Sequence, residues 1–578
     1  MLHLFSQDRH VGTVSRVEGS YVSVDLPSAG ELPGTHFGQR VGLGEVGEFL
    51  IVETGGRGVF GRLIEVSRSG PARDSRDPER APRNEGRVQL LSTLETSGRA
   101  LRGIAVYPRL GDRVFAASEE AVTAVIAGGE PQNASQEIDM GTLAVGNGIG
   151  VRVSTQKLFG RHTAVVGATG SGKSWTLAHL ASSIVELGGR MILVDATGEF
   201  RSLGATATHL ALGSTEGEPL SKLVTVPHWH MRETDRNAFI SPSNGSQLPK
   251  LRAAIRSLRL RHYLDNSDPA WVASSGFGQH LVTAGLFTKA GLSRDAFDRA
   301  QQLLATTIES PFSPFSLSHL ARQVLEECVW PNDPNRPGHF GRVDTNAQGY
   351  ASSLVSRIED LIQTPEIMSV VESPTGGSLL TEVSNWLKSQ EGGVLRVSLR
   401  NLTFSHNLRE IVVNVLGHAL LTMARRGDFR STPVVIALDE AHQFFDVTIG
   451  DETTAHLDGF DLIAKEGRKY GLTVCLATQR PGDLPSGVLS QVGMLIAHRL
   501  ADGRDRQRVE QAAAELDLSA MRLLPGLVPG EAIFMGVDFP VPVSVRVRKP
   551  PHPPESDGPQ YLTGWKPKRT QIDQPELE

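Results

Sequence analysis

The stretch VVGATGSGKSWT, from Val165 to Thr176, decides the fold. Gly167, Gly172, Lys173 and Ser174 have the spacing G-x-x-x-x-G-K-S, with an apolar run before them and the helical pattern WTLAHLASSIVEL after them. Glycines let backbone N–H groups close around phosphate oxygens, and the positive end of the following helix faces the same anion. This order of strand, glycine loop and helix predicts a phosphate-binding loop that opens an α/β domain. Such loops serve kinases, switches, transporters and motors, so the stretch alone leaves the class of protein open.

The chemistry of this loop predicts ATP and Mg²⁺ as cofactors. Lys173 is placed to reach the β- and γ-phosphates, and Ser174 is placed to hold the magnesium ion. Trp175 is bulky, and we expect it to pack beneath the loop. The expected nucleotide-binding residues are Gly167, Ala168, Thr169, Gly170, Ser171, Gly172, Lys173, Ser174 and Trp175.

A first acidic candidate follows one helix later, in GGRMILVDATGEF. Met191 to Val194 predicts a buried strand, and Asp195 stands at its C-terminal tip, where we expect it beside the phosphate-binding loop. A carboxylate there can bind Mg²⁺ through water or position the attacking water, so Asp195 is a catalytic candidate. The alternative is that its side chain caps the backbone of the following loop. Glu199 is a weaker candidate.

A second acidic site lies in TPVVIALDEAHQFF. Val434 to Leu438 predicts an apolar strand, and Asp439 and Glu440 follow directly, as in a Walker B element. We expect Asp439 to hold Mg²⁺ together with Ser174, and Glu440 to take the proton from the attacking water. This pair favours hydrolysis over transfer of phosphate to another substrate.

The segment LIAKEGRKYGLTVCLATQRPGDLP supplies the remaining candidates. Asp461 to Tyr470 predicts a helix that ends in a basic turn, and the apolar strand after it ends near Gln479, whose amide can sense the γ-phosphate or its water. Arg468 is a candidate for the arginine that contacts the nucleotide bound to a neighbouring subunit, because an arginine in that position stabilises charge in the transition state. The alternative for Arg468 is a cation favoured by the helix C-terminus. Arg480 and Arg499 are further arginine candidates.

Length and composition indicate the number of domains and the class of protein that carries these sites. A chain of 578 residues predicts several domains, and its hydrophobic content of 39% and charged content of 21% are those of a globular protein. The N-terminus lacks a signal-peptide pattern and no run of eighteen apolar residues occurs, so we expect a cytoplasmic protein. Cys328 and Cys475 lack a metal-ligand spacing and are expected to be buried. The net charge of -6 neither supports nor excludes DNA as a partner.

The order of strand-like and helix-like sequence patterns along the chain predicts the fold class and the domains. We expect an α/β fold, with a P-loop core of the RecA/FtsK type, an N-terminal β-barrel and an inserted helical domain. Within the helical part, LRAAIRSLRLRH places Arg252, Arg256, Arg259 and Arg261 along one helix, which can contact phosphates in a channel, form a solvated face or contact a subunit. The predicted ranges are a barrel over 1–140, the first part of the core over 141–244, a helical insertion over 245–390, the second part of the core over 391–550, and a proline-rich arm over 551–578.

Five segments in order carry a family resemblance: GATGSGKS, DATGEF, VVIALDEAHQF, AKEGRKYGL and ATQRP. Together they resemble the HerA branch of the HerA/FtsK ATPases. The match extends to a barrel like the family's HAS barrel and to the closing segment GEAIFMGVDFPVPVSVRVRKPP, so nearly the whole chain is covered. The resemblance implies a homo-oligomeric, hexameric ring that hydrolyses ATP between subunits and translocates double-stranded DNA. It also implies a partner on the barrel side, either a NurA-like nuclease or another effector such as a sirtuin-like enzyme in antiphage defence.

Carried over residue by residue, the resemblance implies that Lys173, Asp195, Asp439, Glu440 and Gln479 act at the nucleotide. It further implies Arg468 as the arginine that acts between subunits, and Arg161, just before the loop, as a residue near the nucleotide. The chain departs from the family pattern DPHGEY, because Ala196 and Thr197 replace its proline and histidine. The role of that histidine in relatives therefore does not carry over.

Two functions from different classes remain open from the sequence. The first is an ATP-driven translocase that feeds duplex DNA to a partner nuclease. The second is a ring-shaped scaffold whose ATP state gates a bound effector without obligatory translocation. A third function, a small-molecule kinase, is disfavoured by Glu440 and Gln479.

Overall fold

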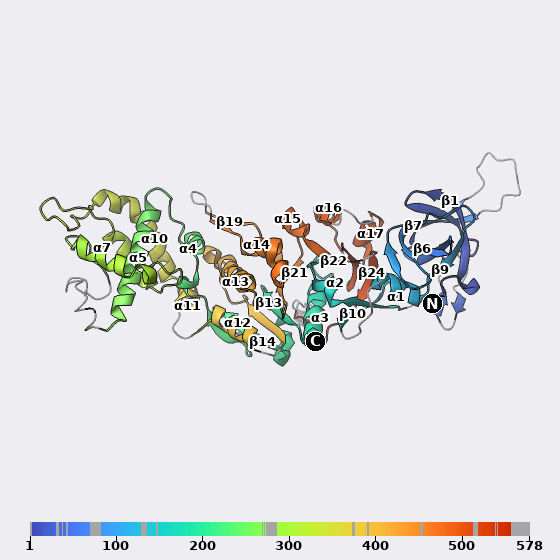
Figure 1. Ribbon diagram of the computed structural model, residues 1–578, viewed down its shortest axis with the longest axis horizontal. Helices are drawn as coiled ribbons and strands as arrows, with labels where there is room; N and C mark the ends of the chain where they lie inside the picture. The colour runs from blue at the N-terminus through green and yellow to red at the C-terminus, as the bar shows by residue number, and fades with distance from the viewer. Residues whose placement is uncertain are drawn as a thin grey trace, which may run out of the picture.

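The computed structural model has an elongated shape built from three parts in a row (Figure 1). A β-barrel lies at one end, an α/β core in the middle and a bundle of helices at the other end. The structure describes residues 3–29, 34–36, 39–41, 44–69, 83–128, 136–145, 148–268, 270, 272, 286–372, 376–389, 392–450, 455–512, 518–537, 539 and 541–555. Most of the expected C-terminal arm, 556–578, lies outside the described residues.

The N-terminal barrel is a sheet that closes on itself. Its strands follow the order β2-β1-β9-β5-β6-β7, and antiparallel pairing of β2 with β7 completes the ring. Every second residue along a strand points inward, so Val22 and Val24 of β2 are fully buried while their neighbours are not. The strands are β1 (His10–Glu18), β2 (Tyr21–Asp25), β5 (Phe49–Thr54), β6 (Arg57–Ser69), β7 (Arg83–Leu94) and β9 (Arg113–Ala116), with β8 (Ala100–Arg102) beside β7 and a separate hairpin of β3 (Gly34–His36) and β4 (Gln39–Val41). The predicted barrel is confirmed.

The core is one thirteen-stranded sheet in which nine neighbouring strands are parallel. In sheet order the parallel strands are β22 (Val492–His498), β12 (His162–Val166), β21 (Leu472–Thr478), β18 (Val434–Leu438), β13 (Arg190–Asp195), β17 (Gly393–Ser398), β14 (Ala207–Leu212), β15 (Lys222–Thr225) and β16 (Gly377–Ser378). Four antiparallel strands extend the β22 end: β23 (Glu531–Met535), β24 (Val543–Val547), β10 (Glu137–Leu143) and β11 (Gly150–Ser154). The expected boundary between barrel and core at residue 140 thus falls inside β10.

Helices cover both faces of this sheet, because its central strands are apolar on both sides. Along β13, Met191 and Leu193 belong to one hydrophobic cluster and Ile192 and Val194 to another. Helix α3 (Lys173–Glu186) packs into the first cluster and α13 (Leu408–Arg426) into the second. The other core helices are α2 (Thr155–Phe159), α12 (Leu379–Lys388), α14 (Gly459–Glu466), α15 (Ser486–Leu489), α16 (Gly503–Ala512) and α17 (Leu518–Leu523), and α1 (Glu119–Ala127) links the barrel to β10. The predicted α/β class is confirmed.

The helical part is built on amphipathic helices whose apolar faces pack together. Leu354, Ile358 and Leu361 of α10 are buried on one face, as their spacing predicts, and Ile362 packs beside them. Cys328 and Cys475 are both buried free thiols, as expected. The helices of this part are α4 (Glu233–Ile240), α5 (Gln247–Asp265), α7 (Arg294–Leu303), α8 (Ala305–Ile308), α9 (Leu320–Glu326), α10 (Thr345–Gln363) and α11 (Pro365–Val371).

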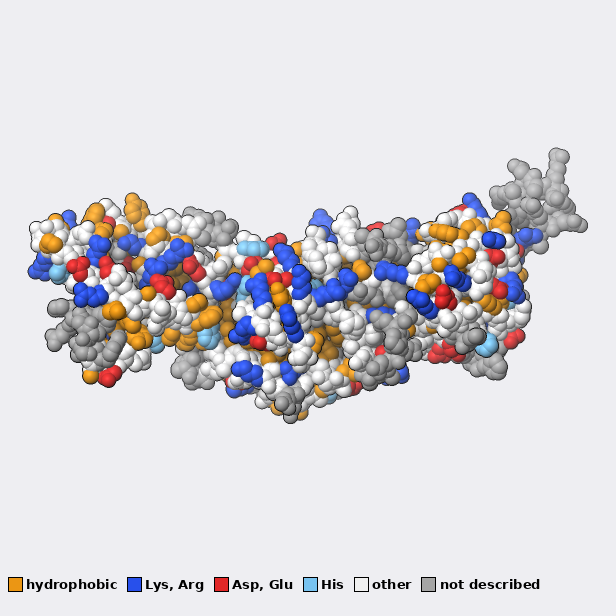
Figure 2. Space-filling view, viewed as in Figure 1, with side chains coloured by type: hydrophobic (Ala, Val, Ile, Leu, Met, Phe, Trp, Pro, Cys, Tyr) orange, Lys and Arg blue, Asp and Glu red, His pale blue; other side chains and the backbone are white. Residues whose placement is uncertain are grey.

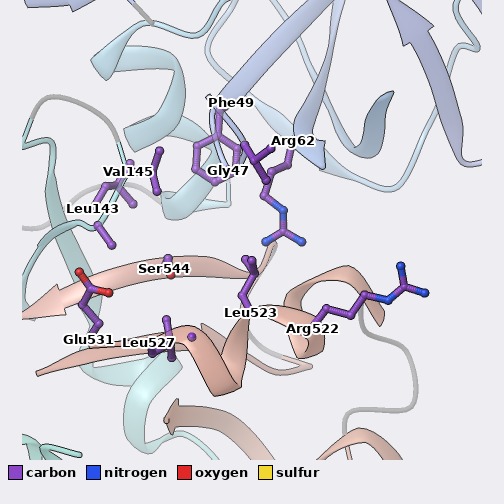
Figure 3. Close-up of a pocket in the computed structure, with 13 residues that line it drawn as sticks. Gly47, Phe49, Arg62, Leu143, Val145, Arg522, Leu523, Leu527, Glu531 and Ser544 are labelled. Atoms are coloured by element: carbon purple, nitrogen blue, oxygen red, sulfur yellow. The ribbon is translucent and has the colours of Figure 1, made fainter. Parts of the chain in front are cut away.

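The barrel meets the core at a cavity of about 360 Å³. Figure 3 shows Phe49 and Arg62 of the barrel on one side, and Ser544, Leu527 and Glu531 of the core on the other. Buried barrel residues also join the cluster under α3, so the two parts share hydrophobic core. None of the helices in the described ranges is long and apolar enough to cross a membrane.

Candidate functional site

The parallel strands deliver the site residues to one edge of the sheet. The loops after β12, β21, β18 and β13 all leave from the carboxyl ends of their strands, where open α/β sheets bind ligands. The strand order places β21 and β18 between β12 and β13. The loop after β12 is therefore next to Gln479, which follows β21, and further from Asp195, which ends β13.

The phosphate-binding loop has a shape that only glycine permits at two positions. A Cβ at Gly167 would lie 2.5 Å from Ser171 Oγ and 2.6 Å from His498 Cβ. Gly172 has φ 115° and lies against the backbone of Gly530. Within the described residues, the N–H groups of Gly170, Gly172 and Lys173 donate to no backbone or side-chain acceptor. The loop thus presents backbone donors at the N-terminus of α3.

A buried histidine that no sequence motif marks packs beneath this loop and supports it. His498, at the end of β22, hydrogen-bonds to Thr176 Oγ1 through Nε2 at 2.8 Å and to the Glu531 carbonyl through Nδ1 at 2.9 Å. Burial lowers the pKa of His498 to about 4, so its imidazole is neutral. The N–H of Gly530 also donates to the Ser171 carbonyl at 2.9 Å. The strand pair β22–β23 therefore fixes the position of the loop.

Lys173 lies between the two carboxylates that follow β18. Its Nζ is 3.2 Å from Glu440 Oε1 and 3.4 Å from Asp439 Oδ1, and all three side chains are largely buried. Burial alone would lower the pKa of Lys173, but the two carboxylates outweigh it and raise that pKa. Burial, together with the nearby carboxylates of Asp195, Glu440 and Glu199, raises the pKa of Asp439 to about 7 against the effect of Lys173. Lys173 thus offsets part of the negative charge of these carboxylates.

Gln479 ties the carboxylate pair to the phosphate-binding loop. Its Nε2 donates to Glu440 Oε1 at 2.5 Å, and its Oε1 accepts from Thr169 Oγ1 at 2.5 Å. Glu440 itself has φ 49°, a left-handed conformation that non-glycine residues adopt mainly where the surroundings enforce it. His442, two residues after Glu440, has Nδ1 3.5 Å from Glu440 Oε2 and 3.1 Å from Thr478 Oγ1. The amide of Gln479 therefore touches both the base candidate and the loop.

Asp195 is placed differently from the expectation that it stands beside the loop and handles water or Mg²⁺. The side chain is fully buried, and both carboxylate oxygens have protein partners. Oδ1 accepts from the N–H of Gly198 at 2.8 Å, and Oδ2 accepts from the N–H of Phe200 at 3.1 Å and from Arg396 Nε at 2.7 Å. The alternative from the sequence, a carboxylate that caps the following loop, describes this geometry. Strand order explains the difference, because two strands separate β13 from β12.

The loop that Asp195 caps carries two other polar residues into the site. Thr197 Oγ1 donates to Asp439 Oδ2 at 3.4 Å. Burial raises the pKa of Glu199, and the nearby ammonium of Lys173 opposes that shift. Glu199, the weaker candidate from the sequence, therefore lies near Lys173 and Asp439.

The arginine candidates divide between the two edges of the sheet. Arg161 precedes β12 and Arg468 precedes β21, so both lie at the amino ends of the strands, opposite the phosphate-binding loop. Arg161 does not lie beside the phosphate-binding loop of its own chain, because the five residues of β12 span roughly 16 Å between them. Arg480 lies at the loop edge, where it pairs with Asp483. At Arg499 the backbone carbonyl accepts from the N–H of Ala168 at 2.9 Å.

Arg468 belongs to a basic surface at that opposite edge. Figure 2 shows blue side chains gathered over the middle of the molecule, where α13 and α14 lie in Figure 1. The Arg468 side chain is exposed and forms no ion pair or hydrogen bond with the described part of the chain. We define the basic edge as the exposed cations at the ends of α13 and α14 and in the turns after them: Arg425, Arg426, Arg430, Lys465, Arg468 and Lys469.

The arginine row in the helical part does not form one phosphate-binding face. Arg259 and Arg261 of α5 are buried, and Arg259 donates to the carbonyls of Ile308 and Pro311. Arg261 is buried against the ring of Phe287 and pairs with Asp265. Arg252 and Arg256 are exposed and pair with Glu233 and Glu309. The possible contact with channel phosphates is therefore wrong for the two buried arginines.

The donor set fits a nucleoside triphosphate with a magnesium ion. A Cβ at Gly167 would clash with its surroundings, the φ of 115° at Gly172 favours glycine, and the buried Ser171 Oγ has no hydrogen-bond partner among the described residues. Ser174 Oγ and Asp439 Oδ are hard oxygen ligands of the kind Mg²⁺ takes alongside phosphate. Across the described ranges, no group of three or more His, Cys, Asp or Glu side chains forms a metal site on its own. The half-buried Trp175 lies next to the loop, and Lys549 stands over its ring at 6.0 Å.

Comparison with known proteins places the chain in a family. Residues 138–276 match the family model for the central domain of helicase HerA, and residues 386–531 match that for the helicase HerA-like C-terminal domain. The DNA double-strand break repair helicase HerA of Pyrococcus furiosus is 23% identical over 466 residues, which cover 80% of this chain and 76% of that protein. The protein of the same name from Sulfolobus acidocaldarius is 23% identical over 459 residues, with 79% and 77% covered.

Two solved structures are also similar. VirB4 of Thermoanaerobacter pseudethanolicus matches with a TM-score of 0.45 and 13% identity, over 73% of this chain and 99% of that one. The bacterial conjugative coupling protein TrwB matches with a TM-score of 0.42 and 15% identity, over 70% and 88%. The residues of this chain that match the two family models include the phosphate-binding loop and the acidic pair described above. Through its central and C-terminal domains, the chain belongs to the HerA-type ATPases.

Proposed function

We propose that this chain hydrolyses ATP in a homo-oligomeric ring and uses that hydrolysis to translocate double-stranded DNA. The observation that carries the proposal is the meeting of Lys173, Glu440 and Gln479 at one edge of the sheet, with Arg468 exposed at the opposite edge. The relatives named DNA double-strand break repair helicase HerA support DNA as the substrate. Six subunits are what the family resemblance favours.

The residues of the loop edge divide the work of hydrolysis. The backbone donors of Gly170 and Gly172 and the ammonium of Lys173 bind the phosphates, and Lys173 then leaves its contacts with Asp439 and Glu440. Ser174 and Asp439 would hold a magnesium ion, which would neutralise charge on the phosphate oxygens. Glu440 accepts the proton of the attacking water. Gln479, hydrogen-bonded to both Glu440 and Thr169, senses whether the γ-phosphate is present.

The basic edge completes the site of a neighbouring subunit. Arg468 cannot reach its own loop, because the seven residues of β21 separate the two by roughly 23 Å. In a head-to-tail ring, one subunit's basic edge faces the next subunit's loop edge. Arg468 then stabilises the charge that develops on the transferred phosphoryl group, an effect of about 10³- to 10⁵-fold in rate for arginines of this kind.

A gated scaffold is the second candidate function. The observation in its favour is the connection between loop and barrel, because Glu531 hydrogen-bonds to His498 beneath the loop and also lines the cavity at the barrel (Figure 3). In this alternative, nucleotide binding changes the barrel face and activates a bound effector, such as a nuclease or a sirtuin-like enzyme in defence, without obligatory translocation. A soluble, cytoplasmic setting is proposed for both functions.

Two measurements separate the functions. ATP hydrolysis by the purified chain is measured with and without duplex DNA over a range of salt concentrations, and triplex displacement reports translocation along that duplex. The translocase predicts stimulation that falls steeply with salt, because phosphate contacts release counterions, and ATP-dependent displacement of the third strand. ATP hydrolysis that duplex DNA fails to stimulate at any salt, with no displacement, would overturn translocation in favour of the scaffold.

A further inference from the structure

A second cavity, of about 460 Å³, lies beside α3 at the antiparallel end of the core sheet. It is lined by residues of α3, of β10 and β11, and of the segment that follows β24. Cavities of this volume are large enough for small-molecule ligands. Its described lining includes no residue of the phosphate-binding loop, so it is a separate place on the core.

Two buried side chains of α3 bring unpaired polar atoms to this cavity. His179 and Ser182 both line it, and they are only 5% and 7% exposed. His179 Nδ1 and Ser182 Oγ have no hydrogen-bond partner among the described residues. A buried polar atom without a partner is costly, and most such atoms in folded proteins are satisfied. A ligand in the cavity would supply the two missing partners.

The chemistry of His179 decides which kind of group must meet it. Its Nε2 lies 2.8 Å from the carbonyl oxygen of Asp139, which only accepts, so Nε2 carries the proton. Burial lowers the pKa of His179 and outweighs the hydrogen bond to Asp139 that would raise it, so the ring is neutral. Nδ1 is therefore an acceptor, and its missing partner is an N–H or O–H donor. An ion that offers only acceptor oxygens, such as sulfate, does not satisfy it.

The cavity also has cations that are available to an anionic group. Arg548 pairs with Asp139 at 2.7 Å, so this guanidinium is already engaged. Arg152 of β11 and Lys549, which follows β24, are both exposed, and neither forms an ion pair with another described residue. Arginine and lysine side chains together are a common way of binding phosphate.

We propose that this cavity binds a small phosphorylated ligand, about as large as a mononucleotide or a sugar phosphate, with its phosphate at Arg152 and Lys549. Hydroxyl or amino groups of the ligand donate to His179 Nδ1 and pair with Ser182 Oγ. Two further carboxylates that line the cavity, Glu137 and Glu186, accept from other hydroxyl groups, as an acidic residue does from ribose in dinucleotide-binding folds. The site gives the chain a second ligand, independent of ATP hydrolysis at the loop edge.

Isothermal titration calorimetry with the full chain tests this site, with adenosine monophosphate and ribose 5-phosphate as the two probes. We expect saturable binding, and the probe that binds more tightly identifies the ligand as a nucleotide or a sugar phosphate. Arg152→Ala should weaken that binding by about tenfold or more, because a charged hydrogen bond is lost, and Ser182→Ala by about 2- to 10-fold. Sulfate, which has no donor, should bind at least about tenfold more weakly than the better probe.

The controls separate loss of the ligand contact from damage to α3. Ser182→Ala removes no hydrogen bond within the described chain, so it should fold normally. Its matched control is Ser92→Ala, which removes another unpaired buried hydroxyl, in β7 of the barrel, and should leave the affinity for the probe unchanged. Arg152→Ala and Ser182→Ala should both leave the affinity for a fluorescent ATP analogue unchanged, because neither side chain belongs to the phosphate-binding loop.

Three results would overturn the inference: no binding of either probe, probe binding that neither variant weakens, or sulfate binding as tight as that of the better probe. Equal losses of affinity for the probe and for the ATP analogue would also overturn it, because they would show a general effect on α3. Each of these results leaves the proposed ATPase function standing, since that function is tested by hydrolysis of ATP.

Discussion

Replacing Glu440 by glutamine should stop hydrolysis while tightening ATP binding. The Glu440 carboxylate lies 3.2 Å from Lys173 Nζ, and that contact must be given up before Lys173 binds phosphate. A hydrogen bond to a charged group contributes about 1.5 kcal/mol or more, so removing this competitor should strengthen ATP binding about tenfold. Loss of the general base should slow turnover by about 10²- to 10⁴-fold.

The assay combines single-turnover hydrolysis with equilibrium binding of a fluorescent ATP analogue. Glu359→Gln is the matched control, since Glu359 is exposed on α10 in the helical part, and it should change neither rate nor affinity. Hydrolysis by Glu440→Gln at the wild-type rate would refute the assignment of the base. Unchanged or weaker ATP binding would refute the idea that Lys173 must leave Glu440.

Two further predictions concern the shape and support of the loop. Gly172→Ala should weaken ATP binding by tenfold or more in the same binding assay, because Gly172 has φ 115° and a Cβ there would lie 3.2 Å from the Gly530 backbone. The control is Gly150→Ala, whose added Cβ meets nothing within 4 Å and should leave binding unchanged. Equal ATP affinities of the two variants would contradict this account of the loop. The pKa of His498 is about 4 in the folded chain against 6.5 in the unfolded chain. Between those pH values only the unfolded chain takes up this proton, so the free energy of unfolding should fall by about 3 kcal/mol as pH decreases from 6.5 to 4. Chemical denaturation at several pH values should show this slope reduced in His498→Gln; an identical slope in wild type and variant would show that His498 is not buried as a neutral group.

Local patterns predicted the parts of the site that local structure determines. The phosphate-binding loop, the acidic pair and Gln479 each follow an apolar strand directly, and parallel strands bring their carboxyl ends to one edge. For this reason, the sequence alone identified Lys173, Asp439, Glu440 and Gln479 as residues that meet. The barrel followed from its short alternating strands in the same way.

The errors came from information that is not local. The position of Asp195 depends on strand order and on Arg396, which lies 201 residues further along the chain. No motif marks His498 at the end of its strand. Its hydrogen bonds to Thr176 and Glu531 show that it supports the phosphate-binding loop.

The most direct test of the central claim, a nucleotide site shared between neighbouring subunits, mixes two inactive variants. Lys173→Ala lacks the phosphate-binding lysine, and Arg468→Ala lacks the arginine at the opposite edge. The measurement is ATP hydrolysis by co-assembled rings whose mixed composition is verified by native mass spectrometry. We predict that activity returns, because some interfaces then pair an intact Lys173 with an intact Arg468 from the next subunit. Verified mixed rings that remain as inactive as either variant alone would contradict the claim.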